Sequence, residues 1–427
     1  MLKNLFLSAL VISVQILTLL VLLHPSGVAG FRIDRSYFTK SPVILVPGDG
    51  GSQLVAKLNK PSKVHIFCDK KTNDYFNLWL NPQLLIPGVL HCWVDNMRLV
   101  YNNVTRRTSN SPGVDIRVPG FGNTSNIEWL DPSGFMPPFI QRMILSNYYV
   151  DIVNGLVDLG YQRDLNIRGA PYDYRKAPNE MGEYYGALKK LVEETYERNY
   201  QKRVTFVCHS LGCPVTSYFF NQQSQLWKKK YIKGLISLGG AYGGAVKAMK
   251  TIASGENLGI LIVKQSDLKI EQMSSTSLAF LLPARQLWGP NEQLAFTKTK
   301  NYTVANYDEF FTDIGYPTGY EMYKDTLPFA EISRKPPGVE VICIYGTGLD
   351  TTEKLDYRKD KSLPNSPKLL TGNGDGTVNI RSLQVCSNWE GKQEQNVYSK
   401  HFPKVEHLSM LSSKLIIDII KHYVVTW

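Results

Sequence analysis

The sequence predicts an α/β fold in which a doubly wound, mostly parallel sheet is covered by helices on both faces. Short apolar runs rich in β-branched residues alternate along the chain with longer segments of helical periodicity. Such runs are typical of strands in a parallel sheet, because both faces of that sheet are buried. The chain has 427 residues, of which 43% are hydrophobic and 20% charged, which excludes general disorder and favours one large globular domain.

The expected elements follow one another in a regular order along the chain. The expected strands are short and apolar, at residues 42–47, 203–208, 232–238 and 339–345. Amphipathic helices are expected where apolar side chains recur at helical spacing, over residues 183–199, 214–227 and 408–424. The first strand ends in the glycine-rich stretch 48–51, which predicts a tight loop at that edge of the sheet.

Two segments interrupt this alternation. Residues 61–105 are more apolar than a surface excursion should be, which predicts a small membrane-binding subdomain. Packing of the same side chains on the main core is the alternative. Residues from about 243 to 335 have weak helical patterns broken by proline and glycine, and they are expected to form a cap or lid inserted into the main domain.

The first 29 residues have the layout of a secretory signal peptide. Lys3 precedes a nearly uncharged apolar run from Leu5 to Leu23, and small residues follow up to Gly30. An uncleaved anchor is the alternative, because nineteen residues could span a bilayer. With cleavage, residues 30–427 form the mature domain, which would be secreted or delivered to the lysosome.

Passage through the secretory route agrees with other features of the sequence. Three Asn-x-Ser/Thr acceptors lie in polar, turn-rich sequence, at Asn103, Asn123 and Asn301. The net charge of +11 favours an anionic partner, which we take to be an anionic phospholipid membrane surface because no nucleic-acid motif occurs. A solvated basic surface without a partner is the alternative.

Six cysteines also fit an oxidising compartment. Six cysteines permit fifteen pairings, so any one pairing is a hypothesis. The hypothesis here joins Cys68 to Cys92 and Cys343 to Cys386, and leaves Cys208 and Cys213 as small buried residues. No CxxC or HExxH spacing occurs, so neither a metal nor a cofactor is expected.

The strongest chemical signal is Cys208-His209-Ser210-Leu211-Gly212, which lies between an expected strand and an expected helix. A strand-to-helix turn of this kind exposes a nucleophilic serine, as in the α/β-hydrolase fold, although Cys208 replaces the first glycine of the G-x-S-x-G pattern. Ser210 is therefore the expected nucleophile. A serine needs a base, and the chain order in this fold is serine, acid, histidine.

The base and the acid are expected after Ser210 in the chain. His407 lies just before the terminal helix and is the expected base; His401 is the reserve candidate, and His422 lies inside that helix. Asp375 lies in a glycine-rich loop after the last expected strand and would orient the imidazole. An ordinary Asp-Gly turn is the alternative for Asp375.

An oxyanion hole needs two backbone amides that point at the same place. The residue after the nucleophile, Leu211, supplies the first amide, and the loop after the first strand supplies the second, through Asp49. A phosphate-binding loop is the alternative for residues 48–51, but no G-K-[ST] follows them.

With these residues identified, the chain resembles the lecithin:cholesterol acyltransferase family over nearly all of residues 41–425. The motifs that carry the resemblance occur in order, and they include PVILVPGDGGSQL, CWVDNMRLVYN, GVDIRVPGFG, RGAPYDYR, CHSLG, GDGTVN and EHLSML. The resemblance implies a hydrolase core with a membrane-binding subdomain and a mobile lid. It also implies an acyl-serine intermediate whose acyl group passes to water or to a lipid alcohol such as ceramide.

The resemblance also implies finer roles. Asp49 matches the lysosomal phospholipases of the family, whereas the plasma cholesterol acyltransferases have cysteine there, which favours a phospholipase A-type hydrolase and O-acyltransferase. Lys247 and Thr377 would contact the phosphate of the substrate. The sequence departs from the family at Gly50, where a leucine is usual, and at residues 240–242, Gly-Ala-Tyr instead of Ala-Pro-Trp. A phosphatidylcholine-sterol acyltransferase and a catalytically inactive lipid-binding protein are the alternatives.

Overall fold

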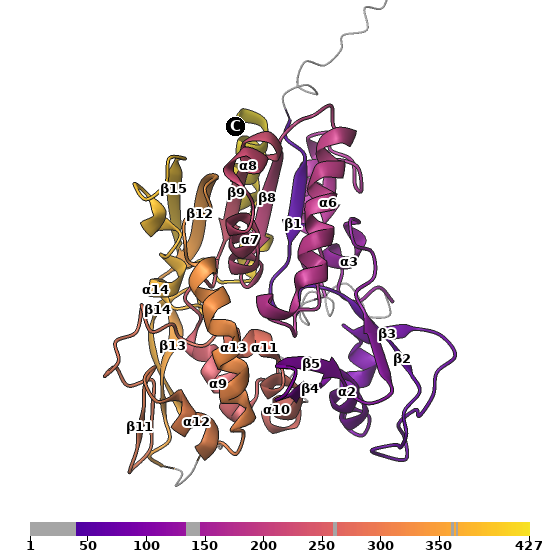
Figure 1. The fold of residues 1–427 in the computed structure, drawn as a ribbon, viewed down its shortest axis with the longest axis vertical. Helices are drawn as coiled ribbons and strands as arrows, with labels where there is room; N and C mark the ends of the chain where they lie inside the picture. The colour runs from indigo at the N-terminus through magenta and orange to yellow at the C-terminus, as the bar shows by residue number, and fades with distance from the viewer. Residues whose placement is uncertain (1–39, 134–145, 259–262, 360–362, 364–365) are drawn as a thin grey trace, which may run out of the picture. The chain divides into compact units, whose positions relative to one another are not determined.

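A six-stranded sheet runs through the centre of the protein (Figure 1). Its order is β15-β12-β9-β8-β1-β7, and every neighbouring pair of strands is parallel. The strands are β1 (Val43–Val46), β7 (Ile167–Gly169), β8 (Val204–His209), β9 (Ile232–Leu238), β12 (Glu340–Thr347) and β15 (Val397–Pro403). This structure is a computed structural model and describes residues 40–133, 146–258, 263–359, 363 and 366–427, so the expected signal peptide lies outside the described residues.

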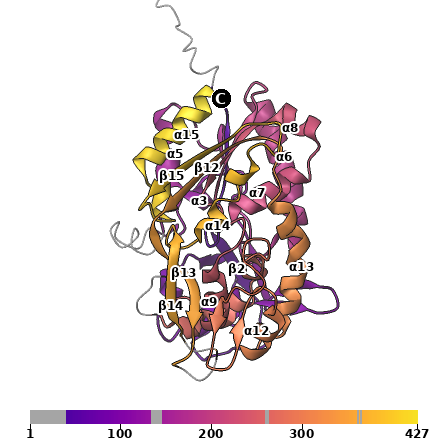
Figure 2. The ribbon, with the colours of Figure 1, turned by 90° about the vertical axis from the view of Figure 1, so that its left-hand side faces the viewer.

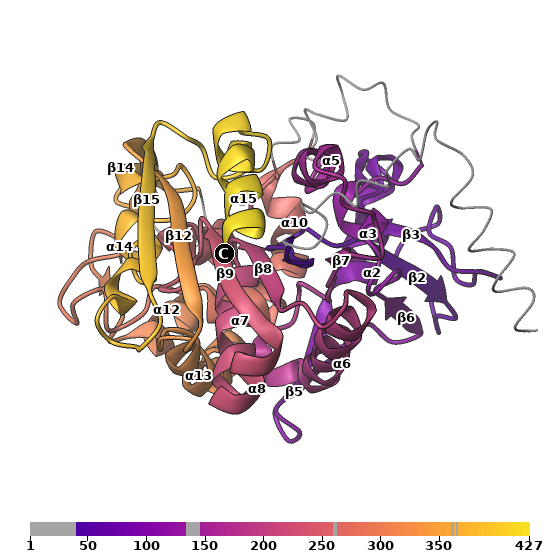
Figure 3. The ribbon, with the colours of Figure 1, turned by 90° about the horizontal axis from the view of Figure 1, so that it is seen from above.

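Helices cover both faces of this sheet, as the view in Figure 3 shows. On one face lie α5 (Val150–Asp158) and α15 (Lys414–Thr426), and on the other lie α6 (Gly182–Arg198), α7 (Gly212–Asn221) and α8 (Gln225–Tyr231). Every residue of β1 and β8 is buried, because each of these strands has helices above and below it. The predicted fold class, an α/β-hydrolase sheet, is therefore confirmed.

Two expected helices have different limits in the structure. The segment expected as one helix over 214–227 is divided into α7 and α8, since the Ser224 hydroxyl accepts a hydrogen bond from the Trp227 amide and begins a new helix. The terminal helix begins at Lys414 rather than at residue 408, because η5 (Ser409–Leu411) forms a separate 3₁₀ turn before it.

One group of elements at the carboxyl ends of the central strands contains the segment expected to bind membranes (Figure 1). Its three-stranded sheet has the order β3-β2-β6, and β4 and β5 form a hairpin. The strands β2 and β6 of this sheet lie outside the predicted range 61–105, and a separate membrane-binding subdomain stays a prediction. The elements are β2 (Leu54–Leu58), β3 (Phe76–Trp79), η2 (Pro82–Leu85), α2 (Leu90–Met97), β4 (Leu99–Asn102), β5 (Arg107–Asn110), β6 (Val114–Arg117) and α3 (Ser125–Glu128).

A second group lies between β9 and β12 in the chain, where the cap is expected. It contains α9 (Val246–Ser254), α10 (Gln265–Met273), α11 (Thr276–Phe280), β10 (Ala295–Phe296), β11 (Asn301–Tyr302), α12 (Tyr307–Asp313) and α13 (Thr318–Ser333). Figure 2 shows α9, α12, β13 and β14 together below the central sheet, beyond one end of its strands. A second sheet, β11-β10-β13-β14, joins this segment to later strands. The remaining elements are β13 (Leu349–Asp356), β14 (Lys368–Gly374), α14 (Ile380–Leu383), η3 (Pro178–Glu180) and η4 (Ser387–Trp389). Movement of this segment as a lid stays a prediction.

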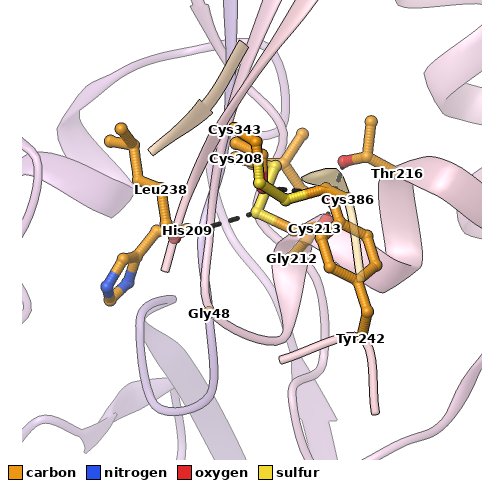
Figure 4. Close-up of a disulfide and its surroundings, with 12 residues drawn as sticks. Gly48, Cys208, His209, Gly212, Cys213, Thr216, Leu238, Tyr242, Cys343 and Cys386 are labelled. Atoms are coloured by element: carbon orange, nitrogen blue, oxygen red, sulfur yellow. Dashed lines mark hydrogen bonds between the residues drawn. A yellow bond between two sulfur atoms is a disulfide. The ribbon is translucent and has the colours of Figure 1, made fainter. Parts of the chain in front are cut away.

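The structure pairs all six cysteines, which differs in one respect from the hypothesis above. Disulfides join Cys68 to Cys92 and Cys343 to Cys386, as expected, and a third joins Cys208 to Cys213. The tight turn between β8 and α7 brings the Cα atoms of this third pair to 4.9 Å, within the range that a disulfide needs. Figure 4 shows the bridge beside Gly212 and Thr216. The expectation of two unpaired cysteines is therefore wrong.

The edge strand β7 gives a test of this packing. A Cβ added at Gly169 would lie 2.2 Å from the backbone carbonyl oxygen of Asn123, and the Gly169 carbonyl itself accepts from the Gly122 amide. Gly169→Ala should lower the free energy of unfolding by about 1–3 kcal/mol, because backbone cannot easily move away. The matched control is Gly186→Ala in α6, where a Cβ has open space and should stabilise by about 0.5–1 kcal/mol. Urea unfolding of both variants measures the difference, and equal effects would contradict the close approach.

Candidate active site

Ser210 lies in a strained turn that joins β8 to α7. Its φ is 53°, in the left-handed region that a serine rarely adopts. The turn approaches the loop after β1 so closely that two glycines are required. A Cβ at Gly48 would lie 2.7 Å from the Ser210 Cβ, and a Cβ at Gly212 would lie 2.3 Å from the Pro47 carbonyl oxygen. This geometry is that of a nucleophile elbow.

Asp375 and His407 form a buried pair. The carboxylate Oδ2 of Asp375 accepts a hydrogen bond of 2.7 Å from His407 Nδ1, and the His407 amide donates to the Asp375 carbonyl at 2.9 Å. The other carboxylate oxygen accepts from the amides of Thr377 and Val378. Because all these partners are donors, Asp375 is held as a carboxylate and Nδ1 carries the proton. His407 Nε2 is then the nitrogen that can accept a proton.

The hydrogen-bond chain from Asp375 through His407 does not extend to Ser210 in this structure. In the described part of the chain, no hydrogen bond joins the Ser210 hydroxyl to His407. In enzymes without bound substrate this bond is often long and shortens only when substrate binds. The other two histidines considered from the sequence lie elsewhere, since His401 is exposed on β15 and His422 is exposed on α15.

A buried polar network connects the loop after β1, the elbow and the histidine loop. The Gly48 amide donates to the Tyr148 hydroxyl at 2.8 Å, and this hydroxyl lies 2.5 Å from His209 Nδ1. His209 Nε2 lies 3.0 Å from the His407 carbonyl oxygen and must donate to it, so Nδ1 accepts from Tyr148. Burial lowers the pKa of His209 well below its usual range, which keeps this histidine neutral.

The two amides expected to form an oxyanion hole are available. Neither the Leu211 amide nor the Asp49 amide donates to an acceptor among the described residues, although Leu211 is fully buried. Buried amides are rarely left without an acceptor, so an unpaired amide beside Ser210 suits a ligand oxygen. This arrangement could stabilise the negative charge that develops on an ester carbonyl oxygen.

A cavity of about 410 Å³ connects these groups. Ser210, His407 and Asp49 line it, together with Lys247 and Thr377. Most of the remaining wall is apolar or aromatic, contributed by Trp79, Trp93, Leu130, Tyr174, Ala241, Ala245, Ala248, Leu258, Leu278, Leu281, Val378 and Leu408. An apolar cavity of this kind suits a long hydrocarbon chain with a reactive polar group near Ser210.

Two acids that line the cavity have raised pKa values. Asp49 is exposed to solvent where it lines the cavity, but the many protein atoms around the cavity partly desolvate its carboxyl group. This desolvation raises the pKa of Asp49 to about 7, against the opposing charge of Lys247. Burial raises the pKa of Glu271 to about 8, with Arg175 opposing and Asp49 adding to the shift. Both acids are therefore largely protonated at acidic pH.

Three residues of this site were not identified from the sequence. Tyr148 and Glu271 lie in segments without a recognisable motif, so no local signal marked them. His209 lies inside the elbow motif, and its place next to the nucleophile was the one available signal. Their roles depend on contacts between segments far apart in the chain.

The surface around the predicted membrane-binding segment is partly apolar. Ile66 is 77% exposed and Phe67 is 67% exposed, in the loop between β2 and β3 that the Cys68–Cys92 disulfide anchors. Val64 and Ile86 are also exposed, whereas Leu85 is only 2% exposed and belongs to the core. Trp79 and Trp93 are buried as well, so the alternative of core packing holds for much of the segment.

Other expected features were located in the same way. The side chains of Asn103, Asn123 and Asn301 are all exposed. In the described ranges, no helix is both long and apolar enough to cross a bilayer. Among those same residues, no group of three or more His, Cys, Asp or Glu side chains is arranged to hold a metal ion.

Comparison with known proteins agrees with this geometry. The family model described as lecithin:cholesterol acyltransferase matches residues 75–414, a range that includes Ser210, Asp375 and His407. The lysosomal phospholipase A and acyltransferase of Canis lupus familiaris is 43% identical over 406 residues, which are 95% of this chain and 94% of that protein.

A second relative and a solved structure extend the comparison. The phosphatidylcholine-sterol acyltransferase of Gallus gallus is 40% identical over 378 residues, 88% of this chain and 89% of that protein. In fold alone, the chain is similar to a crystal structure of the Tle4-Tli4 complex, with a TM-score of 0.50, 12% identity, and coverage of 91% of this chain and 99% of that chain. Since both the family model and these relatives span most of its length, the chain belongs to the lecithin:cholesterol acyltransferase family.

Proposed function

We propose that the protein is a lipid acyl hydrolase and O-acyltransferase of the phospholipase A type. Ser210 is the nucleophile, His407 the general base, and Asp375 the residue that orients the imidazole. The observation that carries this proposal is the meeting of a strained elbow serine with a buried Asp375–His407 pair at one mostly apolar cavity.

The reaction has two halves. First, Ser210 Oγ attacks the ester carbonyl while His407 Nε2 takes its proton, and the amides of Leu211 and Asp49 hold the oxyanion. The ester C–O bond then breaks, and His407 gives the proton to the departing lysophospholipid oxygen. Second, water or a lipid alcohol attacks the acyl-serine, His407 takes the proton from the attacking hydroxyl, and the proton returns to Ser210 as the acyl-serine bond breaks.

The donor is a glycerophospholipid. Lys247 and Thr377 line the cavity that holds Ser210, and an ammonium group and a hydroxyl in one cavity suit a phosphate. The relatives include proteins named phospholipase A and acyltransferase and proteins named phosphatidylcholine-sterol acyltransferase, and the first group is slightly more similar. A raised Asp49 pKa also suits an enzyme that works at acidic pH. A sterol acyltransferase is therefore the second candidate.

The enzyme works at membranes, in the lysosome or outside the cell. Three disulfides and three exposed glycosylation acceptors suit such a compartment. The exposed side chains of Ile66 and Phe67 can enter a lipid surface, and the net charge of +11 favours an anionic one. A ceramide-like alcohol is the proposed acceptor in the second half of the reaction.

The first test removes the nucleophile and separates the two candidate bases. Ser210→Ala should lower release of fatty acid from phospholipid liposomes by about 10⁴-fold or more, with unfolding unchanged, because triad members act as a unit. His407→Ala should be similarly inactive, whereas His401→Ala should keep nearly full activity. A tenth of wild-type activity in Ser210→Ala, or inactivity confined to His401→Ala, would overturn the assignment.

The second test concerns pH. As the pH rises through about 7, Asp49 ionises and its charge disfavours the oxyanion at the neighbouring amides. Lys247 is the facing cation and Glu271 the other facing acid. In Asp49→Asn nothing ionises at this position, so the alkaline limb of kcat/KM for a small soluble ester should move to higher pH. The acidic limb should stay, since Asp49 is already protonated there and the substitution changes no charge. An unchanged profile would mean that Asp49 contributes only its amide.

The third test concerns the membrane. Replacing both Ile66 and Phe67 with serine should weaken binding to anionic liposomes by about tenfold or more, because each apolar side chain gains roughly 1.5–3 kcal/mol on full burial. Hydrolysis of a soluble ester should be unaffected. The control is Leu226→Ser on α8, whose side chain is 83% exposed outside this loop. Equal loss of binding in the control, or parallel loss of soluble esterase activity, would refute a docking role for the loop.

A further inference from the structure

Glu271 is an unpaired acid in the wall of the reactive cavity. The residue is 5% exposed, and it lines the cavity that also contains Ser210. Its carboxyl group makes no hydrogen bond and no ion pair with any described residue. Buried carboxyl groups almost always have partners, because desolvation without compensation is costly. A group that the cavity receives can therefore supply the missing partner.

The neighbouring cation does not supply that partner. Arg175 is fully buried, and its guanidinium group donates to both carboxylate oxygens of Asp173, to the Met97 carbonyl oxygen and to the Asn110 side chain. These bonds hold the guanidinium in place, and none of them is to Glu271. Arg175 therefore acts on Glu271 only through its charge.

Tyr174 provides a second polar group at the same wall. Its ring packs against Trp79 at 5.9 Å between centroids, and its hydroxyl has no hydrogen-bond partner among the described residues. Tyr174 lines the same cavity as Glu271, and the charge of Glu271 adds to the rise in the pKa of Tyr174. An acid and a phenol thus lie in the same cavity wall as the aromatic rings of Trp79 and Trp93.

The chemistry of this pair selects its ligand. At acidic pH both groups are uncharged, since the pKa of Glu271 is about 8, and both can donate and accept hydrogen bonds. A phosphate would meet repulsion whenever Glu271 or Asp49 ionises. Aromatic rings can bind a quaternary ammonium group by themselves, but an uncharged carboxyl group would add nothing to that binding. An uncharged hydroxyl on an apolar molecule fits both the polar pair and the aromatic surroundings.

We infer that Glu271 and Tyr174 form a subsite for a hydroxyl group of the alcohol that accepts the acyl chain. This inference rests on the proposed function. The attacking hydroxyl must give its proton to His407, so the hydroxyl bound by Glu271 is a second one on the same acceptor. Acceptors with two hydroxyl groups are then preferred over those with one.

The test compares two acceptors of equal chain length, a 1-O-alkylglycerol and a primary alkanol, each mixed into phosphatidylcholine liposomes at acidic pH. Wild-type protein should acylate the alkylglycerol faster by roughly three- to tenfold, the usual effect of one or two hydrogen bonds. Glu271→Met should remove most of this preference, Tyr174→Phe should reduce it, and Glu271→Gln should keep it because the amide also donates and accepts. Retention of the preference in Glu271→Met overturns the subsite.

The control acid is Glu256, which lines the same cavity but is paired with Lys250 at 3.1 Å. Glu256→Gln should leave the preference unchanged, and an effect as large as that of Glu271→Met would overturn the inference.

Free fatty acid released in the same assay reports formation of the acyl-serine. If wild-type protein releases none, the proposed function fails first and the subsite falls with it.

Stability gives a readout independent of activity. An acid without a partner stabilises nothing, so Glu271→Met should keep or raise the thermal midpoint. Folding raises the pKa of Glu271 from 4.5 to about 8, so the folded state binds the extra proton and wild-type stability falls as the pH rises between these values. The midpoint gain of Glu271→Met should therefore grow over that range. A large loss of stability at every pH would show a structural partner and overturn the subsite.

Discussion

The close contact between the elbow and the loop after β1 is the constraint on which the rest of the site depends. A serine at φ 53° costs about 1–3 kcal/mol and persists only when its surroundings allow no other conformation. Here the Ser210 amide donates to the Leu238 carbonyl, and the Ser210 carbonyl accepts from Ala241. Gly48 and Gly212 let the two backbones meet. The strained turn at the end of β8 thus directs the Ser210 hydroxyl into the cavity and fixes its position.

The network through Tyr148 and His209 extends this constraint to the base. Its donors all run in one direction, from the Gly48 amide through the phenol and the imidazole to the His407 carbonyl. Aligned hydrogen bonds strengthen one another in a buried setting. The loop that carries the proposed oxyanion amide and the loop that carries the proposed base are therefore positioned by a single set of contacts. A shift of one loop must disturb the other.

Much of this could be predicted from the sequence, because it depends on local patterns. Strands buried on both faces are apolar throughout, and an elbow needs small residues around its serine, so β1, β8 and Ser210 were recognisable. Features that depend on contacts between distant segments could not be predicted from the sequence. The Cys208–Cys213 disulfide follows from the tightness of one turn, and Tyr148 matters because of where His209 lies. Leu85 faces the core although its neighbour Ile86 does not, a difference that needs the three-dimensional fold.

The charges in the cavity depend on which acids keep partners. Glu256 is paired with Lys250, and the Glu406 carboxylate accepts hydrogen bonds from the amides of Leu408 and Ser409, so both acids have partners within the protein. Asp49 and Glu271 are not compensated in this way, and their raised pKa values make them neutral below about pH 7. Ionisation of Asp49 near pH 7 and of Glu271 near pH 8 then adds negative charge to the cavity that contains Lys247. A phosphate-bearing substrate is therefore bound less favourably as the pH rises through this range.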